Sequence, residues 1–341
     1  MDTVWQFVPV LIVGFATALG MTPISRQIAI RLGVVDKPSL PRKIHKDHKP
    51  MMGGLAIYVG LALALLVFSP PRHIAELLVI VGGAGVLALV GLLDDRYNLS
   101  VGLRFGVMTL VALVIIASGS QIRLFGTQVL DIPITIVWIV ALCNAFNFLD
   151  NMDGLTAGMS AIAGLFFLLI ALSQGQVLVA LLAAAILGSA LGFLTYNFNP
   201  ASTFMGDMGS VTLGFLMSIL AIKLQFQHTP LSISWMIPIL VLALPIFDIN
   251  LVVWTRLAEK RSPFEGGRDH TSHRLVALGF TARRAVLVLY VACALFGALG
   301  LFVANTPPAL AAGLGGVALL LLVALYGLMI WIRQTKQKRS S

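Results

Sequence analysis

Residues 177–195 read VLVALLAAAILGSALGFLT, a run without a charged side chain. About 20 apolar residues in a helix are enough to cross the roughly 30 Å hydrocarbon core of a bilayer. The sequence contains eleven runs of this kind, so it predicts an all-α, polytopic integral membrane protein with about eleven transmembrane helices. The expected spans lie near residues 4–25, 54–69, 76–93, 103–119, 132–149, 155–172, 177–195, 208–224, 232–254, 284–304 and 309–332.

The composition indicates the same class of protein. Hydrophobic residues make up 58% of the 341 residues and charged residues 11%, with a mean hydropathy of +0.96. Soluble domains carry about 25% charged residues, so this composition excludes a soluble globular protein. No linker, low-complexity tract or clear internal repeat interrupts the chain, and residues 1–341 are therefore expected to form one integral membrane domain.

The distribution of basic residues predicts the orientation. Of the 23 Lys and Arg residues, 20 fall in the segments 26–49, 96–104, 256–284 and 333–339. Eleven alternating helices place these segments on one side, which the positive-inside rule makes cytoplasmic. The N-terminus is then outside and the C-terminus cytoplasmic, and the net charge of +9 reflects topology, with no nucleic-acid partner implied. The cytoplasmic loops expected to carry an active site are about 26–53, 94–103, 150–154, 196–207 and 255–283.

Two adjacent carboxylates, Asp94 and Asp95, end the third apolar run in the stretch Gly91-Leu-Leu-Asp-Asp-Arg96. An Asp at the centre of a membrane helix costs about 2.5–3.5 kcal/mol, so carboxylates kept at the ends of apolar segments suggest a function. A like-charge pair is unfavourable unless a cation or a proton lies nearby, and Arg96 offers one structural explanation. Adjacent carboxylates also suit Mg²⁺ or a base for phosphoryl transfer, because Mg²⁺ prefers hard oxygen ligands.

Four oxygen-bearing side chains recur every three residues at the end of the fifth run: Asn144, Asn147, Asp150 and Asp153. This spacing predicts a winding stripe along one helix or 3₁₀ turn. A calcium-binding loop is one alternative, but its ligand spacing and terminal Glu are missing. Chance polar decoration is the other.

A loop with Gly206 and Gly209 on either side of Asp207 precedes the eighth run. Its position puts a carboxylate near the amides of a helix start, which favour anions. A simple N-cap Asp is the alternative. In the first cytoplasmic loop, the pair Gly53-Gly54 would let the backbone bend and approach a ligand, although a solvated basic loop explains the rest of that segment.

At these spacings the motifs resemble the polyprenyl-phosphate N-acetylhexosamine-1-phosphate transferase superfamily, glycosyltransferase family 4. The resemblance covers nearly the whole chain in order. It is carried by Gly91-Leu-Leu-Asp-Asp95, Asn144-x-x-Asn-x-x-Asp-x-x-Asp-Gly-Leu155, Phe204-Met-Gly-Asp-Met-Gly-Ser210, Asp269-His-x-x-His-Arg274 and, in the first loop, His45, Pro50, Gly53 and Gly54.

The resemblance implies transfer of a sugar 1-phosphate from a UDP-sugar to a polyprenyl phosphate in the cell membrane, at a site facing the cytoplasm, to initiate a cell-envelope glycan. It implies a Mg²⁺ ion, for which Mn²⁺ can substitute, held by Asp207 and Asn147. The catalytic residues that it implies are Asp94, Asp95, Asp150 and Asp153. The implied substrate-binding residues are His45, Asn144, Asn197, Arg268, His270, His273 and Arg274.

The form Asp-His-x-x-His-Arg and the eleven runs resemble the N-acetylglucosamine-1-phosphate branch of the family. UDP-N-acetylglucosamine and undecaprenyl phosphate are the substrates implied, and a second copy of the chain is a candidate partner in the membrane. Ser272 replaces a His that relatives often carry. The alternatives are the phospho-N-acetylmuramoyl-pentapeptide branch and, in other classes, an ion-coupled secondary transporter or a prenyl-lipid scaffold.

Overall fold

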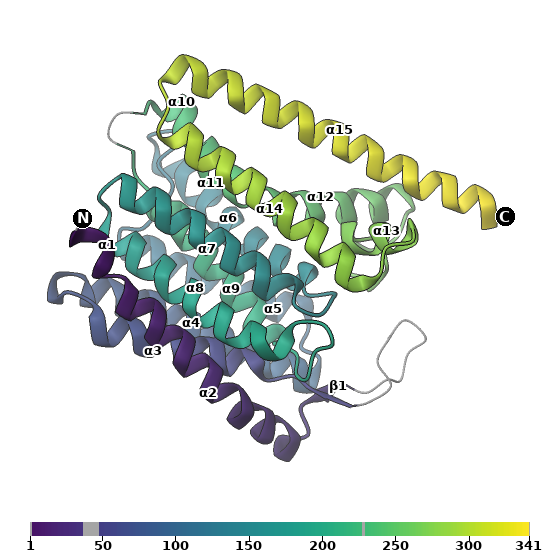
Figure 1. Cartoon of the computed structure of the whole chain (residues 1–341), viewed down its shortest axis with the longest axis horizontal. Helices are drawn as coiled ribbons and strands as arrows, with labels where there is room; N and C mark the ends of the chain where they lie inside the picture. The colour runs from purple at the N-terminus through teal and green to yellow at the C-terminus, as the bar shows by residue number, and fades with distance from the viewer. Residues whose placement is uncertain (1, 37–47, 227–228, 341) are drawn as a thin grey trace. The chain divides into compact units, whose positions relative to one another are not determined.

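The computed structural model describes residues 2–36, 48–226 and 229–340. Contacts within the chain define two compact units, Met1–Leu224 and Gln225–Ser341, which are described separately (Figure 1). The single domain expected from the sequence stays a prediction.

The first unit is a bundle of helices with one short antiparallel strand pair. Val35 of β1 pairs with Pro50 of β2, and Asp36 pairs with Lys49. Its elements are α1 (Asp2–Trp5), α2 (Val8–Leu32), β1 (Val35–Asp36), β2 (Lys49–Pro50), α3 (Gly53–Phe68), α4 (Pro71–Tyr97), α5 (Val101–Ala117), α6 (Gln128–Leu149), α7 (Leu155–Ser173), α8 (Val177–Asn197) and α9 (Gly206–Lys223).

Helices α8 and α9 are the most deeply buried of this unit. Small residues explain how α8 packs so closely on α2. A Cβ atom added at Gly188 would lie 2.2 Å from the carbonyl oxygen of Leu11, and one added at Gly192 would lie 2.4 Å from that of Phe15. Lipid gives helices no hydrophobic reason to associate, so close backbone packing through small residues holds such a bundle together.

The second unit is also helical. It consists of α10 (Leu231–Ser234), α11 (Met236–Val241), α12 (Ala243–Ala258), α13 (Thr271–Ala277), α14 (Ala282–Ala304) and α15 (Pro308–Ser340). The apolar run predicted at 232–254 is not one straight helix, because the chain bends by 78° between Leu231–Val241 and Ala243–Ala258. Such a broken span is tolerated at membrane depth where protein or a polar cavity satisfies the freed backbone groups.

The helices agree with a polytopic membrane protein. Over the described part of the chain, eight helices are long and apolar enough to cross a bilayer, or nine if the bent pair counts as one span. Two further apolar helices, α3 and α5, are shorter. Each run predicted from the sequence therefore contains a helix or a broken helix, while the count of eleven spans and the orientation of the termini stay predictions.

Candidate active site

In the first unit, the C-terminal end of α4 meets the N-terminal end of α9. The backbone N–H groups of Asp207 and Met208 donate to the two carboxylate oxygens of Asp95, at 3.1 and 3.4 Å. The first N–H groups of a helix have no partner within the helix, so Asp95 caps α9 from another helix. The interpretation of Asp207 as the N-cap is wrong, because the helix begins at Gly206 and its cap residue is Met205.

Three glycines, which we call the glycine junction, hold these helix ends together: Gly54, Gly91 and Gly209. A Cβ atom added at Gly54 would lie 2.3 Å from the backbone nitrogen of Gly209, and one at Gly91 would lie 2.5 Å from the carbonyl carbon of Asp207. Gly54 was expected to approach a ligand, but in the structure it approaches the backbone of α9. The junction therefore fixes Asp207 through main-chain packing.

The loop before α9 also pairs with the segment before α3. The carbonyl oxygen of Pro50 accepts hydrogen bonds from the backbone of Phe204 at 2.8 Å and from the hydroxyl of Thr203 at 2.9 Å. In return, the N–H groups of Gly53 and Gly54 donate to the carbonyl oxygens of Phe204 and Met205, each at 2.9 Å. Two loops that are far apart in the sequence are thus hydrogen-bonded to each other at the start of α9.

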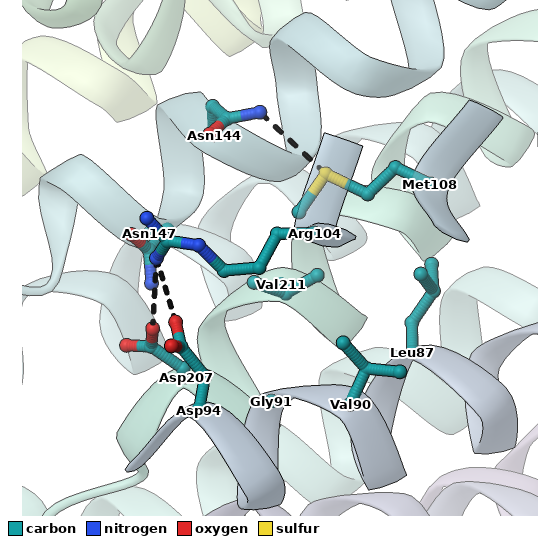
Figure 2. Close-up of a pocket in the computed structure, with 10 residues that line it drawn as sticks. All are labelled: Leu87, Val90, Gly91, Asp94, Arg104, Met108, Asn144, Asn147, Asp207 and Val211. Atoms are coloured by element: carbon teal, nitrogen blue, oxygen red, sulfur yellow. Dashed lines mark hydrogen bonds and ion pairs between the residues drawn. The ribbon is translucent and has the colours of Figure 1, made fainter. Parts of the chain in front are cut away.

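A pocket between α4, α5, α6 and α9 has a polar end (Figure 2). There the guanidinium of Arg104 lies 2.6 Å from a carboxylate oxygen of Asp94 and 3.8 Å from one of Asp207. Asp94 is buried, and its other oxygen accepts the N–H of Leu99 at 2.7 Å. The amide of Asn147 lines the same end and donates to the hydroxyl of Ser210 at 3.2 Å.

The rest of the pocket wall is mainly apolar. Its remaining lining residues are Leu87, Val90, Gly91, Met108, Asn144 and Val211. The amide nitrogen of Asn144 donates to the carbonyl oxygen of Val140 at 2.8 Å and contacts the sulfur of Met108 at 3.6 Å. The charged end of the pocket thus lies beside an apolar wall.

The stripe predicted over residues 144–153 is divided in the structure. Asn144 and Asn147 lie on α6 and line the pocket, whereas Asp150 and Asp153 lie in the turn after that helix. One carboxylate oxygen of Asp153 accepts from the side chain of Asn199 at 3.0 Å and from the backbone of Ala201 at 2.9 Å. Asp153 thereby holds the loop that follows α8, and its catalytic role stays a prediction.

Asn197 is buried and joins two backbone segments. Its side-chain oxygen accepts the N–H of Gly154 at 3.1 Å, and its nitrogen donates to the carbonyl oxygen of Thr203 at 3.0 Å. These bonds give Asn197 a structural role in tying the turn after α6 to the loop before α9. Binding of substrate by this residue stays a prediction.

Asp150 lies in the turn between α6 and α7. Burial raises the pKa of its carboxyl to about 7, and the negative charges of Asp207 and Asp153 add to the effect. The predicted catalytic role of Asp150 stays a prediction.

Arg104 is a site residue that the sequence analysis did not identify. Arg96 was one structural explanation for the acidic pair, but its guanidinium donates to the carbonyl oxygen of Leu32. Arg104 takes that role from the first turn of α5. One sequence signal for this role was available: Arg104 is a cation in the first turn of the apolar helix that follows Asp94 and Asp95. Because the chain reverses direction between the two helices, this first turn lies beside the end of the preceding helix.

In the second unit, the predicted donor-binding motif starts α13. His270 is buried, and its ring Nδ1 lies 2.8 Å from a carboxylate oxygen of Asp248. His273 stacks edge-on against His270, with ring centroids 5.9 Å apart. Burial, together with the charges of His270 and Arg268, lowers the pKa of His273 to about 4, so its ring is neutral at pH 7.

The two arginines of the motif differ in their surroundings. Arg268 is exposed. Arg274 is buried and donates to the hydroxyl of Thr255 at 2.7 Å and to the carbonyl oxygens of Asp269 at 3.0 Å and Met329 at 2.5 Å. These bonds tie α12, α13 and α15 together, so Arg274 has a structural role and its predicted contact with substrate stays a prediction. The remaining predicted binding residue, His45, lies outside the described residues.

Three arginines surround Asp269 next to the motif. Its carboxylate lies 3.0 Å from Arg256, 2.9 Å from Arg261 and 2.6 Å from Arg333. Burial alone would raise the pKa of Asp269, but the hydrogen bonds from these arginines favour the carboxylate and hold its pKa well below the ordinary value. The cluster fixes the segment before His270 to α12 and α15.

We expect Asp269→Asn to lower the unfolding temperature at pH 7, because it leaves the buried Arg256 without its counter-charge, at a cost on the order of 3 kcal/mol. A depressed pKa in the folded state contributes stability above the unfolded-state pKa of about 3.9, and this contribution is lost as the pH falls. The difference in unfolding temperature should therefore narrow below about pH 4. Thermal unfolding of the two proteins in detergent at several pH values tests this, and a difference independent of pH contradicts it.

The fold and the site together define a helical membrane protein with an acidic pocket at the ends of its helices. Residues 77–225 match the model of glycosyl transferase family 4. A "Probable undecaprenyl-phosphate N-acetylglucosaminyl 1-phosphate transferase" of Bacillus subtilis (strain 168) is 38% identical over 298 residues, 84% of this chain and 82% of the relative. The chain belongs to this family of transferases.

Other relatives agree with this assignment. The undecaprenyl-phosphate alpha-N-acetylglucosaminyl 1-phosphate transferase of Yersinia pestis is 30% identical over 312 residues, 85% of this chain and 82% of the relative. The protein of the same description from Escherichia coli (strain K12) is 30% identical over 294 residues, 81% of this chain and 78% of the relative.

Proposed function

We propose that this protein transfers N-acetylglucosamine 1-phosphate from UDP-N-acetylglucosamine to undecaprenyl phosphate, releasing UMP. The observation that carries the proposal is the 38% identity to the Bacillus subtilis relative over 84% of the chain. The pocket supports it, because a polar end with Asp94, Arg104 and Asp207 adjoins an apolar wall. A lipid phosphate needs both kinds of surface.

In the proposed reaction, an oxygen of the lipid phosphate attacks the sugar-bearing phosphorus of the UDP-sugar. A new phosphorus–oxygen bond forms while the bond to UMP breaks, and the electron pair leaves with UMP. Since two anions must meet, catalysis depends on positioning and on neutralising charge. The guanidinium of Arg104 is placed to attract the lipid phosphate, and Asp94 orients that guanidinium.

The oxygen donors at the polar end fit a divalent cation. Asn147 and Asp207 supply an amide and a carboxylate oxygen, which are hard ligands of the kind that Mg²⁺ prefers. Within residues 2–36, 48–226 and 229–340, no group of three His, Cys, Asp or Glu side chains is arranged as a complete metal site, so phosphate oxygens and water would supply the other ligands. Bound there, Mg²⁺ or Mn²⁺ would neutralise the charge that develops on the phosphates.

The test is transfer of radiolabelled N-acetylglucosamine phosphate to lipid by the purified protein. With undecaprenyl phosphate and Mg²⁺, UDP-[³H]N-acetylglucosamine should give a lipid-extractable product and UMP, and removal of the cation with EDTA should abolish it. UDP-N-acetylmuramoyl-pentapeptide should give no product. Use of the peptide donor alone would move the protein to the other branch of the family, and no transfer with either donor would favour the transporter alternative.

We also propose that the pocket opens toward the cytoplasm, where UDP-sugars are made, and that the membrane is the cytoplasmic membrane. The basic segments described above support this orientation. The acceptor needs no transport to reach such a site, because a prenyl chain gains about 0.8 kcal/mol per buried CH₂ and stays in the bilayer. The initiation of a cell-envelope glycan and a homodimeric state remain part of this proposal.

Cysteine labelling in intact cells tests the orientation. Gly102→Cys and Ser262→Cys should react with a membrane-impermeant maleimide only after the cells are opened, whereas Thr127→Cys should react from outside. All three positions are exposed, and the native Cys143 and Cys293 are buried, so the wild-type protein serves as the unlabelled control. Labelling of Gly102→Cys in intact cells would reverse the orientation.

A further inference from the structure

Asp248 of α12 has no role in the proposed reaction. Its carboxylate contacts the motif that starts α13. Asp248 is 2% exposed. A buried carboxylate is costly unless its oxygens are bonded. One of its oxygens lies 2.8 Å from the ring Nδ1 of His270, and the other accepts the backbone N–H of Thr271 at 2.7 Å.

The two bonds fix different parts of the motif. His270 is the N-cap residue of α13, so the bond to Thr271 holds the first turn of the helix in place. The bond to Nδ1 holds the imidazole ring itself. A carboxylate that accepts from Nδ1 fixes both the tautomer and the orientation of a histidine. Any contact of this ring with substrate must then be made by Nε2.

A second buried carboxylate shows what a purely structural role looks like in this chain. Asp131 is also 2% exposed, but a single oxygen accepts the backbone N–H groups of Leu124 and Phe125, at 3.1 and 2.8 Å. These bonds close a loop. Asp248 differs because it devotes one oxygen to a histidine ring.

We propose that Asp248 is a positioning residue that orients His270 toward the phosphates or sugar of the UDP-sugar donor. The inference rests on the proposed function, which supplies the donor. Asp248 acts on the donor through His270, while its bond to Thr271 supports the helix start, so its effect on donor use should depend on the presence of the histidine.

The test is a double-mutant cycle on the full-length protein with Asp248→Asn, His270→Ala and the double variant. In Asp248→Asn, an NH₂ group replaces one of the two oxygens. If it faces Thr271, the bond to that N–H is lost; if it faces His270, it can only donate to Nδ1, which switches the ring to the other tautomer and places the proton on Nε2. We expect kcat/KM for UDP-N-acetylglucosamine to fall about 10-fold to 100-fold, the range found for the hydrogen-bond partners of metal-ligating histidines, while KM for undecaprenyl phosphate stays within about twofold. In the His270→Ala background, the same change should have an effect below about twofold, because the residue through which it acts is gone.

Controls separate positioning from stability. Asp131→Asn should lower the unfolding temperature without changing KM for the donor. If Asp248→Asn does not fold, Asp248→Glu, which keeps the negative charge, replaces it in the same cycle. We expect its kcat/KM for the donor to be higher than that of a protein with an amide at this position. The affinity for UDP-N-acetylglucosamine, measured by calorimetry on the same variants, gives a second double-mutant cycle that does not depend on turnover.

The outcomes are distinct. Additive losses in the cycle would overturn the inference, and so would a folded Asp248→Asn protein with wild-type kcat/KM for the donor. Neither result would contradict the proposed function as long as the wild-type protein transfers the sugar phosphate. Absence of transfer by the wild-type protein would overturn the proposed function, and non-additive loss of UDP-N-acetylglucosamine binding would still support the positioning role.

Discussion

Asp207→Asn should keep the fold and lose nearly all transfer of sugar phosphate. Asp207 faces the pocket from the first turn of α9, and Arg104 lies 3.8 Å from its carboxylate. The proposed metal loses an anionic ligand in this variant. Several kcal/mol of transition-state stabilisation corresponds to a rate loss of at least about 100-fold, at roughly 1.4 kcal/mol per tenfold.

Initial rates across Mg²⁺ and undecaprenyl phosphate concentrations measure the effect. Asp94→Asn should mainly raise KM for the lipid phosphate, because Asp94 holds Arg104 at 2.6 Å. Asp131→Asn, which changes a buried carboxylate of the same unit outside the pocket, should keep kcat and serves as the matched control. A folded Asp207→Asn protein with near wild-type turnover would contradict the proposal that Asp207 binds the metal ion.

Gly91→Ala should abolish activity through packing alone. The added Cβ would lie 2.5 Å from backbone atoms of Asp207 and Met208, which cannot move away as a flexible side chain could. Overpacking of this kind costs about 1–3 kcal/mol or more. We expect a lower unfolding temperature and a loss of turnover at least as large as that of Asp207→Asn, because the end of α9 must shift.

The matched control is Gly82→Ala in the same helix. A Cβ atom at Gly82 meets nothing within 4 Å, and alanine is favoured over glycine in a helix by about 1 kcal/mol. Thermal unfolding and transfer assays on both variants test the pair. Equal activity of the two variants would show that the close approach of α4 and α9 is not required.

The sequence predicted well those features that depend on local chemistry. The long apolar runs predicted the helices, and the unusual carboxylates and amides led to Asp94, Asn147 and Asp207, which the structure brings together in one pocket. Hydrophobic length and the cost of a charge in a membrane act within one segment. They can therefore be read without knowing which segments become neighbours.

The features that were missed depend on contacts between segments. The three-residue spacing did not show that Asp153 turns away to bond Asn199 and Ala201, because the helix ends between Asn147 and Asp153. Arg104 was counted only as a topology signal, since its role requires α5 to fold back beside α4. Asp248 lies inside an apolar run, and its partner His270 is 22 positions later in the chain, so the sequence did not show that the two side chains meet.

The glycine junction has a consequence for any large mutational survey of this protein. Gly54, Gly91 and Gly209 carry no functional group, yet their replacement should silence the enzyme as completely as loss of a catalytic carboxylate. A survey that scores growth or product alone would place both kinds of residue in one class. Scoring the abundance of each variant in the membrane alongside its product would separate them, because a junction variant should be depleted from the membrane whereas Asp207→Asn should accumulate to the wild-type level.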